Sequence, residues 1–242
     1  MSSPIIQLFN YIKNGDYITA LLMIVMFGLL IFVSLPFHEL AHAFVANKLG
    51  DSTPKWQKRL TFNPLAHLDP IGTGMMLICG FGYAKPVPVN AANFKRPKKD
   101  MALVALAGPV SNLLLAFLGL LLFRVAGWAL GMSVSGGEVY VSYEHVELVN
   151  VLKLILVDVF ASINIGLAVF NLLPVFPLDG SHIIAPLLPD KVNWWIERNQ
   201  QVVMLALLVL ILSPVLDLPL YYLRGLVGWL LCLPLGLPNL FF

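Results

Sequence analysis

Apolar residues dominate four long stretches of the chain, and polar residues are concentrated in the segments between them. The four stretches are residues 17–46, 101–130, 148–173 and 201–223. A helix needs about 20 apolar residues to cross the hydrocarbon core of a bilayer, so each stretch predicts a transmembrane helix. Residues 225–242 are also apolar but are interrupted by Pro234 and Pro238. We expect an interfacial or tilted helix there, because a proline removes a helical hydrogen bond.

Two shorter apolar segments predict structures that do not span a membrane. Residues 1–16 are too short and too polar to cross it, but their isoleucine, leucine and phenylalanine side chains can form the apolar face of an interfacial helix. A disordered tail is an equal alternative for this segment. Residues 71–83 are apolar, rich in glycine and too short for a straight span. They predict a re-entrant or hairpin segment that is buried in protein.

The six residues from Lys85 to Asn90 predict an extended strand that can pair along one edge only. Pro86 and Pro88 point to the same edge and provide no N–H group there. Residues 85, 87 and 89 keep their N–H and C=O groups on the opposite edge. The sequence therefore predicts a strand with one edge available to a partner.

The composition excludes an ordinary soluble domain. Of the 242 residues, 59% are hydrophobic and 12% are charged, whereas about a quarter of the residues in a soluble domain are charged. We predict an all-α polytopic membrane protein with about 4–6 transmembrane helices in a single domain over residues 1–242. Its core is expected at residues 17–190, followed by C-terminal helices within residues 201–242.

Net charge, cysteine content and the N-terminus narrow the interpretation further. The formal net charge of +2 gives no reason to expect a nucleic-acid partner. Cys79 and Cys232 lie in apolar surroundings, so they indicate neither a disulfide framework nor a cysteine-based metal site. The N-terminus lacks a basic flank followed by a cleavage site, so we expect the first apolar stretch to be retained rather than removed as a signal peptide.

The basic residues are unevenly distributed along the chain, and their distribution predicts an orientation. Nine of the 15 Lys and Arg residues lie within residues 48–100, whereas residues 131–147 contain three Glu and no Lys or Arg. By the positive-inside rule, residues 47–100 face the cytoplasm and residues 131–147 face outward. We therefore expect a multi-pass protein of the cytoplasmic (inner) membrane, with the lipid bilayer as its surroundings.

The first apolar stretch ends in the sequence His38-Glu39-Leu40-Ala41-His42, an H-E-x-x-H motif. On an α-helix, positions i and i+4 are about 40° apart and about 6 Å apart along the axis. Both imidazoles can therefore bind one Zn²⁺, and Glu39 lies close enough to act on a metal-bound water. Five residues alone occur by chance in many proteins, so the interpretation depends on a third ligand.

Asp179 is the best candidate for that third ligand, because a catalytic zinc site uses three protein ligands and a water. It follows a helix end broken by Pro174 and Pro177, at the same predicted depth on the cytoplasmic side as His38. Gly180 beside it allows a close approach of the backbone. Ionisable residues inside apolar spans are costly and usually functional, which favours a zinc site over a hydrogen-bonded structural cluster.

Other ionisable residues are weaker candidates for the metal. We expect His145 in the outer loop, and we expect His67 and Asp69 to form local hydrogen bonds in the cytoplasmic loop, where a regulatory role is the alternative. His182 lies three residues after Asp179 and is a less favoured ligand.

Lys153 and Asp158 lie within a predicted span. They are five residues apart and so are not neighbours on an α-helix. We therefore expect each of them to find a partner on another helix or at a helix end, and we assign them no chemistry.

Asn112 lies within the second long apolar stretch, and its side-chain amide has two interpretations. It can donate a hydrogen bond to a developing oxyanion, or it can bond a neighbouring helix as a packing device, together with Gly108. The sequence leaves both alternatives open.

Five segments in a fixed order carry a family resemblance. They are HELAH at 38–42, NPLAHLDPIGT at 63–73, GYAKPVPVN at 82–90, AGPVSN at 107–112 and NLLPVFPLDG at 171–180. Together they resemble the site-2 protease family of intramembrane zinc metalloproteases, over roughly residues 17–190. The chain is similar to the compact bacterial or archaeal branch, without an inserted PDZ-like domain or a C-terminal CBS-type domain.

The resemblance implies a three-helix catalytic core with zinc held by His38, His42 and Asp179. It also implies Glu39 as the general base and a position near the active site for Asn112. Because better-studied members carry PDZ-like or CBS-type domains, their absence leaves substrate selection and regulation by nucleotides open.

The predicted function is regulated intramembrane proteolysis of a transmembrane protein substrate by a zinc metalloendopeptidase. A helix hides its backbone, so the substrate must unwind, and the available edge at Val87 and Val89 could pair with it by strand addition. Two alternatives belong to other classes. A non-catalytic membrane scaffold predicts a damaged motif, and a metal transporter predicts polar residues repeated along several spans. The sequence identifies neither the substrate nor the oligomeric state.

Overall fold

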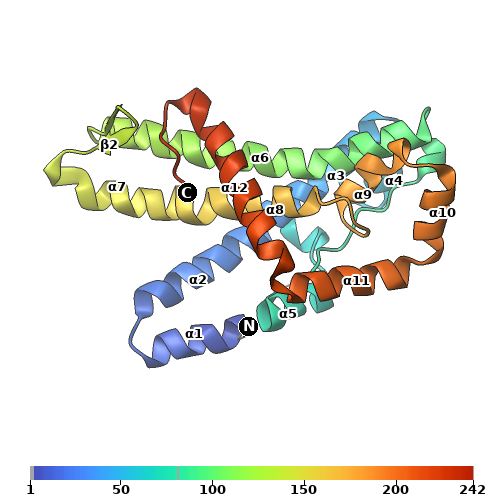
Figure 1. Ribbon diagram of the computed structural model, residues 1–242, viewed down its shortest axis with the longest axis horizontal. Helices are drawn as coiled ribbons and strands as arrows, with labels where there is room; N and C mark the ends of the chain where they lie inside the picture. The colour runs from blue at the N-terminus through green and yellow to red at the C-terminus, as the bar shows by residue number, and fades with distance from the viewer. Residues whose placement is uncertain (1–2, 81, 242) are drawn as a thin grey trace. The chain divides into compact units, whose positions relative to one another are not determined.

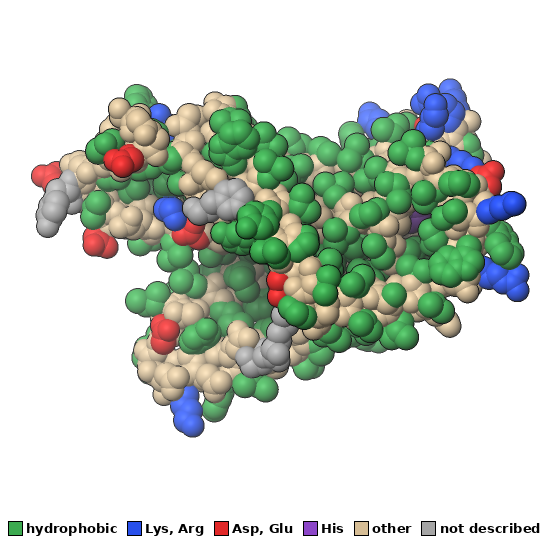
Figure 2. All heavy atoms as spheres, in the orientation of Figure 1, with side chains coloured by type: hydrophobic (Ala, Val, Ile, Leu, Met, Phe, Trp, Pro, Cys, Tyr) green, Lys and Arg blue, Asp and Glu red, His purple; other side chains and the backbone are tan. Residues whose placement is uncertain are grey.

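The computed structural model describes residues 3–80 and 82–241 and is mainly helical. Within these residues, four helices are long and apolar enough to cross a membrane. They are Tyr17–Lys48, Pro97–Ala129, Val146–Asn171 and Pro214–Leu235. Hydrophobic side chains cover most of the face in Figure 2, and charged side chains are few on it. The chain is therefore an all-α multi-pass membrane protein, as the sequence predicts.

The chain forms two compact units, Met1–Gly108 and Pro109–Phe242, with the boundary inside one helix, α6 (Pro97–Ala129). Figure 1 labels the helices of both units. The first unit contains α1 (Pro4–Lys13), α2 (Tyr17–Leu29), η1 (Leu30–Ser34), α3 (Leu35–Lys48), α4 (Thr53–Trp56), η2 (Pro64–Ala66), α5 (Pro70–Cys79), η3 (Ala91–Asn93) and the start of α6. Two units do not by themselves decide whether the chain is one membrane domain, so that stays a prediction.

The first long helix runs through α2, η1 and α3 without interruption, and η1 is a π-helical turn. Pro36 has no N–H group for a helical hydrogen bond. Just before it, the N–H of Leu35 donates to the carbonyl of Leu30, five residues back. The proline break that the sequence predicts is thus accommodated by one wide turn, and the helix continues into the H-E-x-x-H motif.

A short amphipathic helix precedes this span. In α1, Ile5, Ile6, Phe9 and Ile12 are all exposed, and the helix packs against α2 and α5. The chain turns between α1 and α2, and the Asp16 side chain caps α2 by accepting a hydrogen bond from the N–H of Thr19. Of the two alternatives for residues 1–16, the structure has the helix rather than a disordered tail.

The glycine-rich apolar segment forms α5, which at ten residues is about 15 Å long and too short to span. Asp69 caps its start, and Gly80 ends it in the left-handed conformation with φ 81°. Residues 82–90 then follow without helix or strand structure, and a Cβ on Gly72 would lie 2.1 Å from the carbonyl oxygen of Tyr83. Glycine therefore allows α5 and the returning chain to pack backbone against backbone.

The second unit holds the remainder of α6 and the C-terminal helices. Its elements are β1 (Ser133–Ser135), β2 (Glu138–Tyr140), η4 (Tyr143–His145), α7 (Val146–Lys153), η5 (Leu154–Ala161), α8 (Ser162–Asn171), α9 (Asp179–Ile184), η6 (Ala185–Leu187), α10 (Asp190–Arg198), α11 (Gln200–Leu212), η7 (Pro214–Leu216), α12 (Asp217–Cys232) and η8 (Leu233–Leu235). The strands β1 and β2 form an antiparallel hairpin with Val134 opposite Val139. This is the one sheet among the described residues, and residues 85–90 form no strand, so the strand predicted there is not present in the structure.

The core of the second unit lies between α6 and the continuous helix α7–η5–α8. Phe123 and Leu120 of α6 are fully buried against Val157 and Ile165. The helix α12 packs across α8 and adds Cys232 to the same core (Figure 1). These side chains join α6, the helix α7–η5–α8 and α12 through one hydrophobic core.

The predicted span at residues 201–223 is wrong in its boundaries. The helix α11 ends at Leu212, Ser213 is extended, and a new helical segment begins at Pro214. The residue before a proline is disfavoured in the α conformation, so Ser213 breaks the apolar run. The fourth long apolar helix is instead Pro214–Leu235, and α10 and α11 meet at an angle of 81°.

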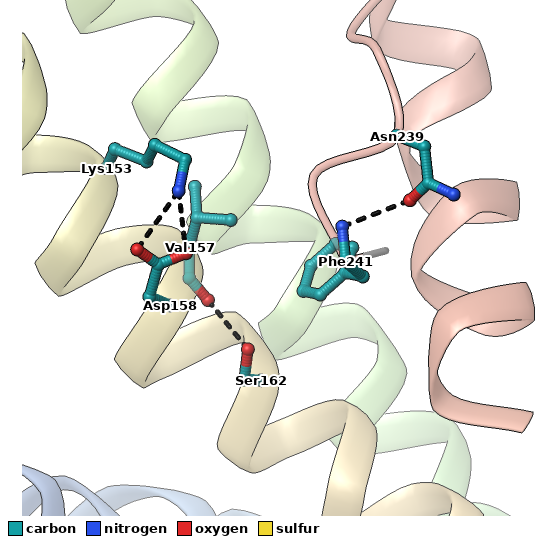
Figure 3. Close-up of polar contacts among 6 residues, drawn as sticks. All are labelled: Lys153, Val157, Asp158, Ser162, Asn239 and Phe241. Atoms are coloured by element: carbon teal, nitrogen blue, oxygen red, sulfur yellow. Dashed lines mark hydrogen bonds and ion pairs between the residues drawn. The ribbon is translucent and has the colours of Figure 1, made fainter. Parts of the chain in front are cut away.

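The expectation that Lys153 and Asp158 have no partner on their own helix is also wrong. The Lys153 ammonium lies 3.0 Å from one carboxylate oxygen of Asp158 and 3.1 Å from the other. Lys153 directly precedes the π-helical segment η5 and Asp158 lies within it, where the backbone hydrogen bonds reach five residues back rather than four. The Ser162 hydroxyl also donates to the carbonyl of Val157, five residues earlier (Figure 3).

This pairing predicts how the chain responds to loss of one charge. Lys153→Met leaves an unpaired carboxylate on an apolar span and is expected to lower the free energy of unfolding by about 2 kcal/mol. The double variant Lys153→Met/Asp158→Leu removes both charges and is expected to recover most of that loss. Thermal unfolding in lipid nanodiscs measures both. A double variant less stable than the single one would contradict the ion pair as the reason.

Candidate metal centre

The helix α3 carries both histidines of the H-E-x-x-H motif on its buried side. His38 is 5% exposed and His42 is 8% exposed. Their rings meet edge to face with centroids 4.7 Å apart, and one ring nitrogen of each lies within 4.8 Å of the other. One helix therefore holds two imidazole nitrogens close enough to share a metal ion.

A backbone carbonyl determines the tautomer of His42. Its Nδ1 lies 2.7 Å from the carbonyl oxygen of Val104, which is on α6 and within the same compact unit. Since a carbonyl only accepts, the Nδ1 atom must carry the proton. The Nε2 atom then presents a lone pair, which is the form of histidine that binds metals.

The backbone of α6 lies close against both rings. A Cβ on Gly108 would lie 2.4 Å from Nε2 of His42 and 2.6 Å from Cε1 of His38. Only a residue without a side chain allows this approach. The space around the two imidazoles is therefore shaped by bare backbone, and two buried ring nitrogens fit a zinc ion.

Glu39 is half-buried between the two histidines in the sequence. Its Oε2 atom accepts a hydrogen bond of 3.2 Å from the N–H of Val87. The extended segment that the sequence predicts thus lies beside the motif helix. Two of the N–H groups on its available edge are engaged within the chain, because Lys85 also donates to the carbonyl of His67 at 2.8 Å. The side chain of Val89 is partly buried against the core formed by Ala46, Phe94 and Val104.

Asp179 lies in the second unit as the first residue of α9 and is half-buried. A Cβ on the next residue, Gly180, would lie 2.3 Å from the carbonyl oxygens of both Leu172 and Leu173. The start of α9 is therefore packed directly on the end of α8, as the glycine predicts. Asp179 thus has a fixed position relative to α8, and its assignment as a zinc ligand stays a prediction.

The packing interpretation of Asn112 has structural support. Its Nδ2 atom donates to Oδ1 of Asn164 on α8 at 2.9 Å, and both residues are fully buried. Asn164 in turn donates to the carbonyl of Phe160 at 2.9 Å. The two amides therefore join α6 to α8, and the oxyanion role of Asn112 stays a prediction.

Two of the weaker candidates, His67 and Asp69, have the local hydrogen bonds that the sequence predicts. The ring of His67 bonds the carbonyl of Thr61 at 2.9 Å, and Asp69 accepts from the N–H groups of Ile71 and Gly72. His182 is exposed on α9.

Sequence reasoning missed two buried ionisable residues beside the motif helix. Asp51 is fully buried and Arg59 is 6% exposed, and both bond backbone groups in or next to the segment that follows α5. The pattern D-S-T-P after Gly50 is a helix-start signal and could have drawn attention to Asp51. No local pattern points to Arg59.

The fold and the site together define a class: multi-pass α-helical membrane proteins with the paired-histidine helix of a metalloprotease. The profile of Peptidase family M50 matches residues 26–213, and the chain belongs to this family, the site-2 proteases.

Two relatives carry the name "Putative zinc metalloprotease". YwhC from Bacillus subtilis (strain 168) is 43% identical over 186 residues, which cover 75% of this chain and 78% of that protein. Rip2 from Mycobacterium tuberculosis (strain H37Rv) is 28% identical over 202 residues, which cover 82% of this chain and 70% of that protein. No solved structure matches the chain.

The contact at Gly108 predicts the effect of one added methyl group. Gly108→Ala is expected to displace both imidazoles and to lower the affinity for zinc roughly 10–100-fold, the usual range for groups that orient metal ligands. Gly28→Ala is the matched control, because Gly28 is on the same continuous helix as the motif and has open space at its Cβ position. Zinc titration of the purified variants measures the effect. Equal affinities in the two variants would contradict the contact.

Proposed function

We propose that this chain is an intramembrane zinc metalloendopeptidase, which hydrolyses a peptide bond within or near a transmembrane segment of another protein. The observation that carries the proposal is the pair of buried imidazoles, His38 and His42, on a helix continuous with an apolar span. Membership of Peptidase family M50 supports a peptidase reaction at this site. The position of the motif inside the span supports a substrate that is also in the membrane.

The zinc ion is proposed to be held by His38, His42 and Asp179. A zinc site with two imidazoles and one carboxylate leaves a fourth position for water. The names of the relatives support zinc over other metals. When bound, the metal supplies a water of lowered pKa and polarises the carbonyl of the scissile bond.

Glu39 is proposed as the general base of the reaction. Its carboxylate accepts the proton of the attacking water and then donates it to the leaving amine. The N–H of Val87 holds the Oε2 atom from one side, which limits the rotation of the carboxylate. During the reaction the Nδ1 atom of His42 keeps its proton and donates its hydrogen bond to the carbonyl of Val104. Asn112, whose amide bonds Asn164, is also proposed as a donor to the oxyanion.

The substrate is proposed to bind in an extended conformation beside residues 85–90. A helical substrate hides its carbonyl groups, so it must unwind before attack. Val87 and Val89 lie on the edge that has N–H groups, and strand addition along this edge would place a substrate near Glu39. Because Val87 now donates to Glu39, pairing at this residue requires that bond to be exchanged.

The site is proposed to face the cytoplasmic side of the inner membrane, in a single membrane domain over residues 1–242. The support is the concentration of Lys and Arg in residues 48–100 and their absence from residues 131–147. The bilayer surrounds the exposed apolar helices.

The role of Glu39 is tested on a panel of single-span membrane proteins with the zinc-loaded enzyme. Glu39→Gln is expected to keep zinc and to lose cleavage by roughly 10²–10⁴-fold, because the amide cannot accept the proton. Glu197→Gln on α10 is the matched control, because Glu197 is exposed. Membrane proteomics of cells with each variant identifies the fragments that disappear. Unchanged cleavage in Glu39→Gln would rule out the proposed mechanism.

The third ligand is tested separately by metal content. Asp179→Asn is expected to lower zinc affinity by more than about 100-fold, because the amide is a poor ligand and two histidines alone bind weakly. His182→Ala, three residues further along α9, is expected to bind zinc as the wild type does. If His182→Ala loses zinc and Asp179→Asn keeps it, the assignment of the two residues is reversed.

A further inference from the structure

Asp51 lies just after the end of α3, and its carboxylate connects two parts of the chain by hydrogen bonds. It is fully buried and accepts hydrogen bonds from four donors. They are the Thr53 N–H at 3.0 Å, the Thr53 hydroxyl at 2.5 Å, the Asn90 N–H at 2.7 Å and the Asn93 Nδ2 atom at 2.7 Å. An ionised carboxylate only accepts, and here Oδ1 accepts three of the bonds and Oδ2 the one from Asn90. The group joins α3 to residues 90–93, about 40 positions further along the chain.

The charge state of Asp51 agrees with this arrangement. Burial raises the pKa of Asp51, but the hydrogen bonds from Thr53, Asn90 and Asn93 lower it by more, so the pKa lies below its ordinary value. A carboxyl whose pKa is lower in the folded state stabilises the fold above its ordinary pKa. That contribution is lost only as the pH falls through the lowered value. Asp51 is therefore an ionised acceptor at neutral pH.

The backbone and the apolar side chains around Asp51 provide the same connection. Gly50 has φ 114°, and a Cβ there would lie 3.3 Å from the carbonyl oxygen of Asn93. Beside it, Phe94 is buried against Ala46 of α3 and Val104 of α6. Residues 90–94 thus pack on the end of the motif helix through polar and apolar contacts together.

A second buried group holds the other end of the extended segment. The guanidinium of Arg59 donates to the carbonyls of Ala66 and Lys85, the latter at 3.4 Å. The N–H of Lys85 donates to the carbonyl of His67 at 2.8 Å. Residues 85–90 are therefore held at both ends, and Val87 donates to Glu39 between them.

Register is critical in this segment because of its sequence. Successive residues of an extended chain point to opposite edges, so a shift by one residue exchanges the two edges. On either side of Val87 stands a proline, Pro86 or Pro88, that has no N–H group. A slip by one residue in either direction would therefore bring a proline opposite Glu39 and remove the donor completely.

We propose that Asp51 is a positioning residue of the reaction: by holding Asn90 and Asn93 at the end of α3, it keeps Val87 opposite Glu39. It does not touch the substrate. Its effect on cleavage rests on the proposed function, in which the substrate binds along residues 85–90. Loss of Asp51 then weakens substrate binding, while His38, His42 and Glu39 keep their places on α3.

The experiment compares Asp51→Asn and Asp51→Ala with Thr53→Val in the full-length protein. Thr53→Val removes one of the four donors but keeps the bonds of Asp51 to Asn90 and Asn93. Asp51→Asn keeps the shape but places an amide N–H₂ against donors. Hydrogen–deuterium exchange measures residues 85–94, with α12 as the internal reference. Kinetics use a substrate that the wild type cleaves and Glu39→Gln does not.

Both Asp51 variants are expected to exchange roughly tenfold faster in residues 85–94 and to raise KM roughly tenfold, with kcat within about twofold of wild type and zinc retained. Thr53→Val is expected to stay near the wild type in all four measurements.

Unchanged exchange and KM in Asp51→Asn would overturn the proposal. A fall in kcat together with zinc loss and faster exchange in α12 would also overturn it, since that pattern is general destabilisation. If the wild type cleaves no substrate, the proposed function fails. Faster exchange confined to residues 85–94 in the Asp51 variants would then still support the role of Asp51 in holding this segment.

Discussion

The site depends on the close packing of two imidazoles against the backbone at the start of α6. A polar ring on an apolar helix is costly unless its hydrogen-bonding groups are satisfied. Here the carbonyl of Val104 accepts the proton of His42, and Gly108, one turn further along α6, leaves room for both rings. Because residues four apart lie on one face of a helix, a single face of α6 both fixes the tautomer and shapes the space around the ring nitrogens.

Two of the long apolar helices contain a π-helical segment, and the physical reasons differ. In the first, Pro36 cannot donate to the preceding turn, and the wide turn η1 before it keeps the helix continuous. In the second, η5 brings Lys153 and Asp158 together and allows Ser162 to bond the carbonyl of Val157. Such turns rotate the later part of a helix relative to its earlier part, and they are frequent at functional sites. In the first helix, η1 directly precedes the turn that carries His38.

Local patterns predict much of the fold and of the motif helix. The spans around residues 17–46, 101–130 and 148–173, the short apolar α5 and the pairing of His38 with His42 all follow from periodicity and spacing. The predicted span at residues 201–223 is wrong, because a hydropathy window passes over Ser213 and Pro214 without registering the break.

Contacts that depend on irregular or distant backbone cannot be predicted from such patterns. The Lys153–Asp158 pair requires π-helical rather than α-helical spacing, which periodicity does not reveal. The environment of Asp51 depends on Asn90 and Asn93, which are distant in the sequence. The role of Asp179 follows from the motif and the family, and it stays a prediction.

The hydrogen bond between Val87 and Glu39 links the motif helix to the extended segment. A carboxylate in an apolar setting needs a donor before any substrate arrives, since an unsatisfied charged group is costly to bury. A neutral backbone N–H at 3.2 Å satisfies it with a bond that contributes only about 1 kcal/mol net, so the bond is readily exchanged. The prolines on either side have no N–H, so neither residue adjacent to Val87 can replace it as the donor. The resting carboxylate and an incoming strand therefore compete for the same donor. The position of Val87, set by contacts at Lys85 and Asn90, determines which of them receives it.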